Sequence, residues 1–120
     1  MKLRYIDLLK SVTPMKLICE KDNIPFLTSL LISNNVVTID NAIENYFSLK
    51  SDLDNKYLVK DGTTSNSLVI KKGLEEIYLK NLTELNETEI DINITKIPPA
   101  DLSDICFPPK YVNGILFMLN

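Results

Sequence analysis

The sequence of 120 residues contains no histidine and only three glycines, and both shortages exclude common kinds of functional site. Without histidine there is no imidazole to activate a serine or cysteine nucleophile or to bind a metal ion. Gly62, Gly73 and Gly114 are isolated from one another, so they cannot form a glycine-rich phosphate-binding loop. We therefore expect a protein that is not an enzyme and that has no cofactor, metal site or small-molecule ligand.

Arginine is also scarce, since Arg4 is the single one in the chain. Bidentate recognition of phosphate or guanine depends on arginine, and a nucleic-acid-binding domain normally has a basic face. The net charge is −3, and it is uneven: residues 1–83 carry eleven basic and ten acidic groups, whereas residues 84–120 carry two and six. Direct binding of nucleic acid is therefore not expected.

The two cysteines, Cys19 and Cys106, are too few for a disulfide framework and match no zinc-site spacing. The N-terminal residues lack the uninterrupted apolar stretch of a signal peptide, and no segment approaches the 18 or so apolar residues of a membrane-spanning helix. With 45% hydrophobic and 24% charged residues, the composition is typical of a globular protein. The prediction is a single domain over residues 1–120, located in the cytoplasm and without a membrane partner.

Local patterns in the first half of the chain predict short elements. A helix over residues 3–11 is expected to end before Pro14, because proline interrupts helical hydrogen bonding. The alternation of apolar and polar residues then predicts a strand at 15–20. The two apolar runs 24–33 and 36–39 are expected to pair as a hairpin around an Asn-Asn turn.

The period of the apolar residues changes from Asn41 onward. We expect helices at 41–54 and 73–85, a hairpin within 56–72, and a strand at 87–97 in which Ile90, Ile92 and Ile94 share a buried face. Pro99 is expected to begin a short helix that reaches Cys106. Together these patterns predict an α+β fold, with an antiparallel sheet of about four to six short strands and about two to four short helices packed on one face.

An acidic stretch precedes the tail of the chain: Glu84, Glu87, Glu89 and Asp91 have no basic residue between them. Most charge runs are solvated surfaces. Two functional alternatives are capture of a basic protein by mimicry of a phosphate backbone and ligation of a hard cation. We take Glu87, Glu89 and Asp91 as candidate partner-binding residues.

The chain ends on an apolar segment, in which ten of the residues 105–120 are apolar. Within it, the sequence Pro108-Pro109-Lys110-Tyr111 has the form of a ligand for WW domains. Such ligands lie in exposed flexible segments, whereas this one has Phe107 before it and a run of apolar residues after it. The segment is therefore expected to pack, either on its own domain or on another chain.

The same segment resembles one found in bacteriophage head-to-tail connector and tail-accessory proteins. In that pattern an apolar residue, two prolines and a tyrosine lead into a helix with a small residue and a leucine-rich face. The matching positions here are Phe107, Pro108, Pro109, Tyr111, Gly114, Ile115 and Leu119. The resemblance implies a role in phage assembly, and the Asn-, Ile- and Lys-rich composition suits an AT-rich phage or bacterial genome.

The sequence thus favours a non-catalytic protein-binding or assembly protein, encoded by a phage or another mobile element, that binds a protein partner or forms a homo-oligomer. Its candidate contact residues are the large apolar ones of the tail, since such anchors dominate interface energetics: Phe107, Tyr111, Ile115, Phe117 and Leu119. One alternative is a soluble inhibitor or regulator that captures a host protein through the acidic residues 84–91. The rival class is a metal-dependent enzyme that uses aspartate or glutamate.

Overall fold

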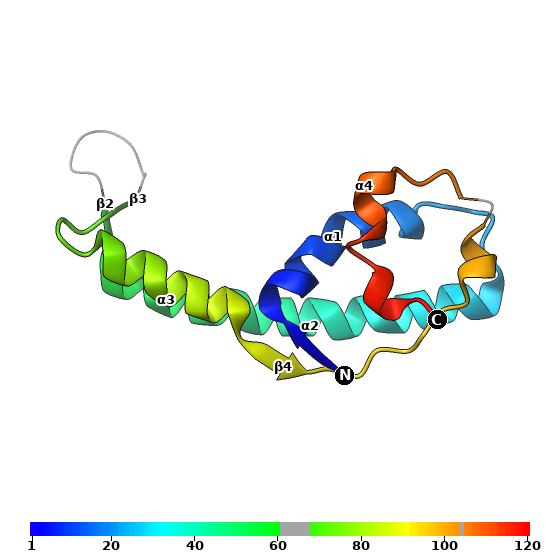
Figure 1. The fold of residues 1–120 in the computed structure, drawn as a ribbon, viewed down its shortest axis with the longest axis horizontal. Helices are drawn as coiled ribbons and strands as arrows, with labels where there is room; N and C mark the ends of the chain where they lie inside the picture. Colours follow the sequence, from blue (N-terminus) through cyan, green and yellow to red (C-terminus); the bar gives the residue numbers. More distant parts are fainter. Residues whose placement is uncertain (61–67, 104) are drawn as a thin grey trace.

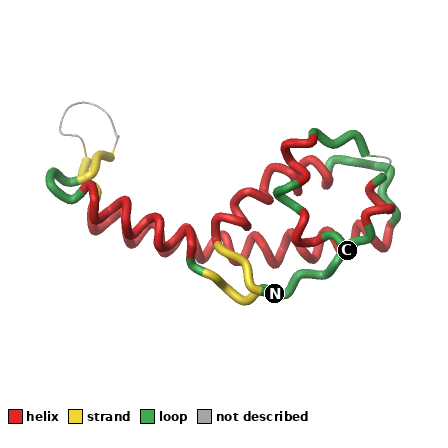
Figure 2. Tube along the Cα trace, viewed as in Figure 1, coloured by secondary structure: helices red, strands yellow, loops and turns green. Residues whose placement is uncertain are grey.

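The computed structural model describes residues 1–60, 68–103 and 105–120, and it shows an α+β chain dominated by helices (Figures 1 and 2). The α-helices are α1 (Tyr5–Cys19), α2 (Phe26–Tyr57), α3 (Glu75–Glu87) and the short α4 (Pro109–Val112). Two 3₁₀ turns, η1 (Pro99–Leu102) and η2 (Leu116–Met118), lie in the C-terminal part. Among the described residues, no helix is both long enough and apolar enough to cross a membrane.

The strands form two separate antiparallel pairs in the described part of the chain. β1 (Lys2–Arg4) pairs with β4 (Glu89–Asp91), and β2 (Leu58–Lys60) pairs with β3 (Leu68–Ile70). The hairpin predicted within 56–72 is confirmed, although its loop lies outside the described residues. The single sheet of four to six strands is not formed, because the segments expected to supply its other strands are helical.

The hairpin predicted around the Asn-Asn turn is wrong, because residues 26–57 form one continuous helix, α2. Val36 and Val37 are β-branched and have a weak preference for helix. Burial decides the outcome instead: the positions of α2 that face the body recur every three or four residues, as in Thr28, Ile32, Asn35, Ile39, Ile43 and Tyr46. The helix predicted at 41–54 is the second half of α2.

The strand predicted at 15–20 is also wrong, because α1 continues through Pro14 to Cys19. Met15 and Ile18 lie on the same buried side of α1 as Leu8. Pro14 removes one N–H from the helical ladder, which leaves the carbonyl of Lys10 without its usual donor. Packing of this apolar side outweighs that loss, so the proline is accommodated rather than ending the helix.

The alternation of buried and exposed side chains predicted for residues 87–97 is confirmed, although only Glu89–Asp91 form a strand. Ile92 is buried and Ile90 and Ile94 are half-buried, while Asp91 and Asn93 are exposed. Within 87–97, β4 forms the one strand ladder, and the chain beyond it runs to Ile97, which forms an isolated parallel bridge with Leu119. Pro99 begins η1, as predicted, but this helix ends at Leu102 rather than at Cys106.

The molecule is elongated, with principal extents of 53 × 31 × 22 Å and a radius of gyration of 17.9 Å. A compact chain of this length would have a radius of gyration of about 13–14 Å. The cause is α2, along which α1 and α3 follow one another (Figure 1). α1, the first part of α2 and the C-terminal residues 92–120 form what we call the body. Residues 46–60 and 68–87 form a projecting arm, and the β1–β4 pair lies at its root, where the arm meets the body.

Candidate protein-binding surfaces

The two helices of the arm are held together by hydrogen bonds from tyrosines. The hydroxyl of Tyr46 donates to Oδ1 of Asn86 at 2.5 Å, near the root of the arm, where α3 meets the body. Nearer the tip, where the β2–β3 hairpin lies, Nδ2 of Asn81 donates to the hydroxyl of Tyr57 at 3.1 Å. Tyr57 also packs edge-on against the ring of Tyr78. The contact between α2 and α3 is therefore partly polar.

A charged network reinforces the middle of the arm. Asp54 accepts hydrogen bonds from the hydroxyl of Tyr78 at 2.7 Å and from Nζ of Lys50 at 3.0 Å. The hydrogen bond to Asp54 raises the pKa of Tyr78, because ionisation would place two negative charges side by side. The same carboxylate raises the pKa of Lys50 by hydrogen bonding to its charged form. Tyr78 is thus kept in the protonated form that joins α3 to α2, and Lys50 in the charged form that pairs with Asp54 one turn along α2.

The outside of the arm is apolar. Seven large apolar side chains of this thin projection are exposed, several of them by about half: Phe47, Leu49, Val59, Leu68, Val69, Ile77 and Leu79. Positions two apart on a helix point in nearly opposite directions, so Ile77 and Leu79 lie on opposite flanks of α3. No described part of the chain covers either flank fully. The arm thus has buried tyrosine rings and their hydrogen bonds between its helices, and exposed apolar side chains among the charged ones outside.

Charge is separated along the same arm. Residues 55–60 and 68–74, at the tip, include Lys56, Lys60, Lys71 and Lys72 and no acidic residue. The root holds the acidic stretch that the sequence revealed, on the last turn of α3 and on β4. The 13 residues of α3 separate these ends by about 20 Å.

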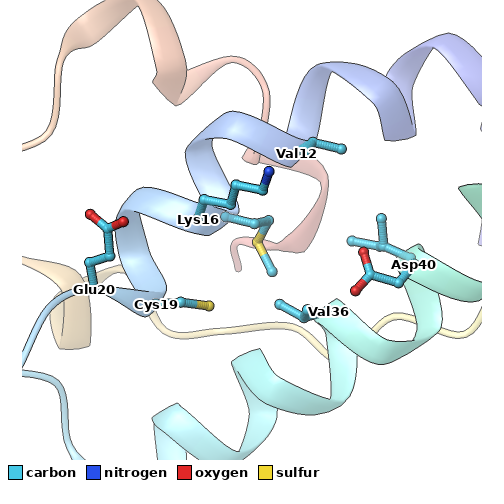
Figure 3. Close-up of a pocket in the computed structure, with 8 residues that line it drawn as sticks. Val12, Lys16, Cys19, Glu20, Val36 and Asp40 are labelled. Atoms are coloured by element: carbon cyan, nitrogen blue, oxygen red, sulfur yellow. The ribbon is translucent and has the colours of Figure 1, made fainter.

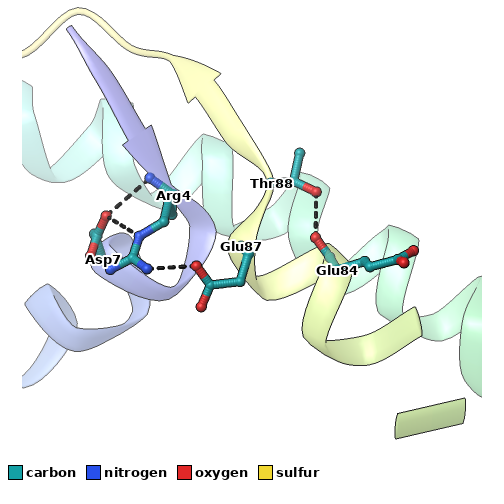
Figure 4. Close-up of polar contacts among 5 residues, drawn as sticks. All are labelled: Arg4, Asp7, Glu84, Glu87 and Thr88. Carbon is teal, nitrogen blue, oxygen red and sulfur yellow. Dashed lines mark hydrogen bonds and ion pairs between the residues drawn. The ribbon is translucent and has the colours of Figure 1, made fainter. Parts of the chain in front are cut away.

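Arg4 fastens the root of the arm to the body (Figure 4). Its guanidinium donates to Glu87 at 2.5 Å and, through Nε and Nη2, to both carboxylate oxygens of Asp7. The hydrogen bond from Arg4 is the main reason that the pKa of Asp7 lies below its ordinary value. The single arginine of the chain therefore pairs with one carboxylate of α1, that of Asp7, and with one of α3, that of Glu87.

The predicted acidic contact residues are brought together but are not equally available. Glu87 pairs with Arg4, and Asp91 pairs with the N-terminal ammonium of Met1 at 3.2 Å. Glu89 lies opposite Arg4 in the β1–β4 register and is exposed. Within the described residues, its carboxylate and that of Glu84 form no ion pair. The sequence could not show that bases from the N-terminus reach this stretch.

The apolar tail packs on its own body. Ile115 is 3% exposed and Met118 is fully buried, both within the main core. The backbone of Ile97 donates to the carbonyl of Met118 at 2.7 Å and accepts from the amide of Asn120 at 3.1 Å. A partner therefore cannot reach Ile115 without displacing this segment.

The other predicted tail residues are half-buried. Phe107 and Tyr111 are in ring contact, with centroids 6.2 Å apart. Phe107 and Leu119 also line a small apolar pocket of about 160 Å³ together with Ile18 of α1. Phe117 packs against the same core from its edge. These residues are gathered at one side of the body, but their apolar surface is largely turned inward.

Gly114 explains how closely the tail approaches α1. A Cβ at this position would lie 2.7 Å from the carbonyl oxygen of Lys10 and 3.0 Å from Cγ of Pro14. The Lys10 carbonyl is the one that Pro14 leaves without a helical donor. Gly114 of the tail therefore lies directly against the Lys10 carbonyl and the Pro14 ring of α1.

An apolar pocket lies between α1 and α2 (Figure 3). It has a volume of about 330 Å³ and is lined by Val12, Met15, Lys16, Cys19, Glu20, Val36, Ile39 and Asp40. Partial burial at the edge of this pocket raises the pKa of the Cys19 thiol, although the residue is exposed overall. Among the described residues, no group of three or more cysteine or acidic side chains is placed to hold a metal ion.

A second exposed apolar patch lies at the beginning of α2. Phe26 and Leu27 are 74% and 73% exposed, and Leu30 extends the patch by one turn. It lies at the end of α2 opposite to the arm.

Comparison with models of protein families gives no match, and neither do the comparisons with curated proteins and with solved structures.

Proposed function

We propose that this protein is a non-catalytic assembly protein that works by binding protein through the exposed apolar flanks of its arm. The observation that carries the proposal is the set of large apolar side chains left exposed on a projecting pair of helices, among them leucine, isoleucine and phenylalanine. Exposed apolar patches on a soluble chain are typical of interaction sites. The arm projects from the body, so a partner can approach it from either side.

The tail has a different role in this proposal. Its anchors stabilise the body, so the contact surface moves from residues 107–119 to the arm. The resemblance of that segment to phage connector proteins, together with the composition, supports assembly of a phage or a related mobile element as the setting. The site of action is then the host cytoplasm or the assembled particle.

Site-specific photocrosslinking in the cells or particles that contain the protein tests this function. A photoreactive phenylalanine at Leu79 or at Ile77 should give discrete protein adducts, because both side chains are about half exposed on the arm. The matched control is the same residue at Thr13, which is exposed on α1 in the body. Adducts at neither arm position, or equal adducts at Thr13, would count against the proposal.

A further inference from the structure

The surface area of the chain gives the first indication of what covers the arm. The molecule exposes 7909 Å². A compact monomer of 13.6 kDa is expected to expose about 6,600 Å². The excess of about 1,300 Å² is somewhat more than one partner contributes to a standard interface, about 800 Å². The excess of the whole chain is therefore large enough for one protein–protein contact, and the arm is the part that departs most from a compact shape (Figure 1).

The charges of the arm indicate which partner fits. The described tip residues 55–60 and 68–74 include lysines and no acidic residue, whereas the root carries Glu84, Glu87, Glu89 and Asp91. Arg4 pairs with Glu87 and the N-terminal ammonium with Asp91, so Glu84 and Glu89 are the carboxylates left for a partner. Lys72 at the tip and Glu84 and Glu89 at the root are exposed and form no ion pair within the described residues. The acidic pair that follows the tip, Glu75 and Glu76, occupies the first turn of α3, where the helix dipole already favours it.

An arm that is basic at one end and acidic at the other is complementary to itself when inverted. Two arms in parallel orientation would place lysines against lysines and glutamates against glutamates. Two arms related by a two-fold axis across the arm would place each tip against the root of the other. The same surface patch is then used on both copies, as a two-fold interface requires.

We infer that the arm pairs with the arm of a second copy of this chain in antiparallel orientation. The apolar flanks meet in the middle, and Lys71 and Lys72 of each copy lie against Glu84 and Glu89 of the other. This inference rests on the proposed function, since it names the partner of the same surface. It makes the homodimer the unit that takes part in assembly.

Charge reversal tests the orientation, with the mass in solution measured by sedimentation over a concentration series. The full-length protein should form a dimer. The tip variant Lys71→Glu with Lys72→Glu should weaken the dimer by about tenfold or more, because two acidic ends then meet. The root variant Glu84→Lys with Glu89→Lys should weaken it similarly. The variant with all four changes should return to near the original affinity.

Two controls separate this contact from a general effect of charge or exposed apolar surface. Lys16→Glu with Lys21→Glu changes the same number of charges on the body, and it should leave the dimer intact. Phe26→Ser with Leu27→Ser removes the most exposed apolar pair away from the arm, and it should also leave the dimer intact. Phe47→Ser with Leu79→Ser should give a monomer with unchanged helical circular dichroism.

The outcomes also separate this inference from the proposed function. A full-length protein that stays monomeric throughout, or a dimer that tolerates tip and root reversal, would overturn the antiparallel pairing. If that monomer still crosslinks from Leu79 to a different protein in its native setting, the arm binds another partner and the proposed function stands. If it neither dimerises nor crosslinks, both proposals fail.

Discussion

Asn35 pairs with the backbone of Thr95, 60 residues further along the chain. Its Nδ2 donates to the carbonyl of Thr95 and its Oδ1 accepts from the amide of Thr95, both at 2.9 Å. The side chain of Asn35 is almost fully buried in the middle of α2. One amide thus satisfies both backbone groups of an extended segment that has no strand partner there. This pair joins the extended segment that follows β4 to α2.

Replacing Asn35 by alanine should destabilise the fold by about 1–3 kcal/mol, because two partly buried backbone groups of Thr95 lose their partner. Chemical denaturation measures the loss as a lower unfolding midpoint. The neighbouring Asn34 provides the control, since its side chain is exposed. Asn34→Ala should change stability by less than about 0.5 kcal/mol. Equal effects at the two positions would show that the Asn35–Thr95 pair contributes little.

Gly114→Ala tests the contact between the tail and α1. The added methyl group would meet the Lys10 carbonyl and Pro14, so the tail must shift outward. The expected cost is about 1–3 kcal/mol, as for overpacking of a well-packed site. Asn113→Ala, at the exposed neighbouring position, is the control and should be nearly neutral. An unchanged melting temperature for Gly114→Ala would contradict the close approach.

Met118→Ala tests whether the tail belongs to the core. Met118 is fully buried, so truncation should cost about 2–5 kcal/mol. Leu116→Ala removes a similar side chain that is 52% exposed, and it should cost much less. Deletion of residues 107–120 should abolish cooperative unfolding, because Ile115 and Met118 leave the core together. A truncated chain that stays folded would restore the tail as a candidate interface.

The elements that the sequence predicts correctly depend on neighbouring residues only. The β2–β3 hairpin has two β-prone runs close together, and α3 has acidic residues in its first turn and a helical apolar pattern. The predictions for α1 and α2 were wrong because contacts between residues far apart in the sequence decide these two helices. Pro14 and the Asn-Asn pair carry local signals for a helix end and a turn, and distant packing overrides both. Asn35 has its partner at Thr95, which no local pattern reveals.

The arm could not be predicted for a related reason. The apolar residues of α3 form a pattern that predicts burial on one face, and Tyr78 and Leu85 do face α2. Whether Ile77 and Leu79 are covered depends on how many elements surround α3. In this fold only α2 accompanies it along most of its length (Figure 1). The sequence did reveal the acidic root, but not that a basic tip lies at the other end of the same helix.

The pH dependence of stability should reveal the Arg4–Asp7 pair. The folded-state pKa of Asp7 is lowered from its ordinary value of 3.8, chiefly by the hydrogen bond from Arg4. A carboxyl group with a lowered pKa contributes stability above its ordinary pKa, and this contribution is lost as the pH falls through the folded-state pKa. Asp7→Asn lacks this contribution at every pH.

The difference in unfolding free energy between the unmodified protein and Asp7→Asn should therefore be constant near neutral pH and shrink below about pH 4. Asp22→Asn, on the exposed segment between α1 and α2, removes one carboxylate in the same way and should show no such narrowing. Unfolding curves at closely spaced pH values measure both differences. If the Asp7 difference stays constant down to the acid limit, Arg4 does not stabilise the charged form. The fastening of the arm's root would then depend on its contact with Glu87.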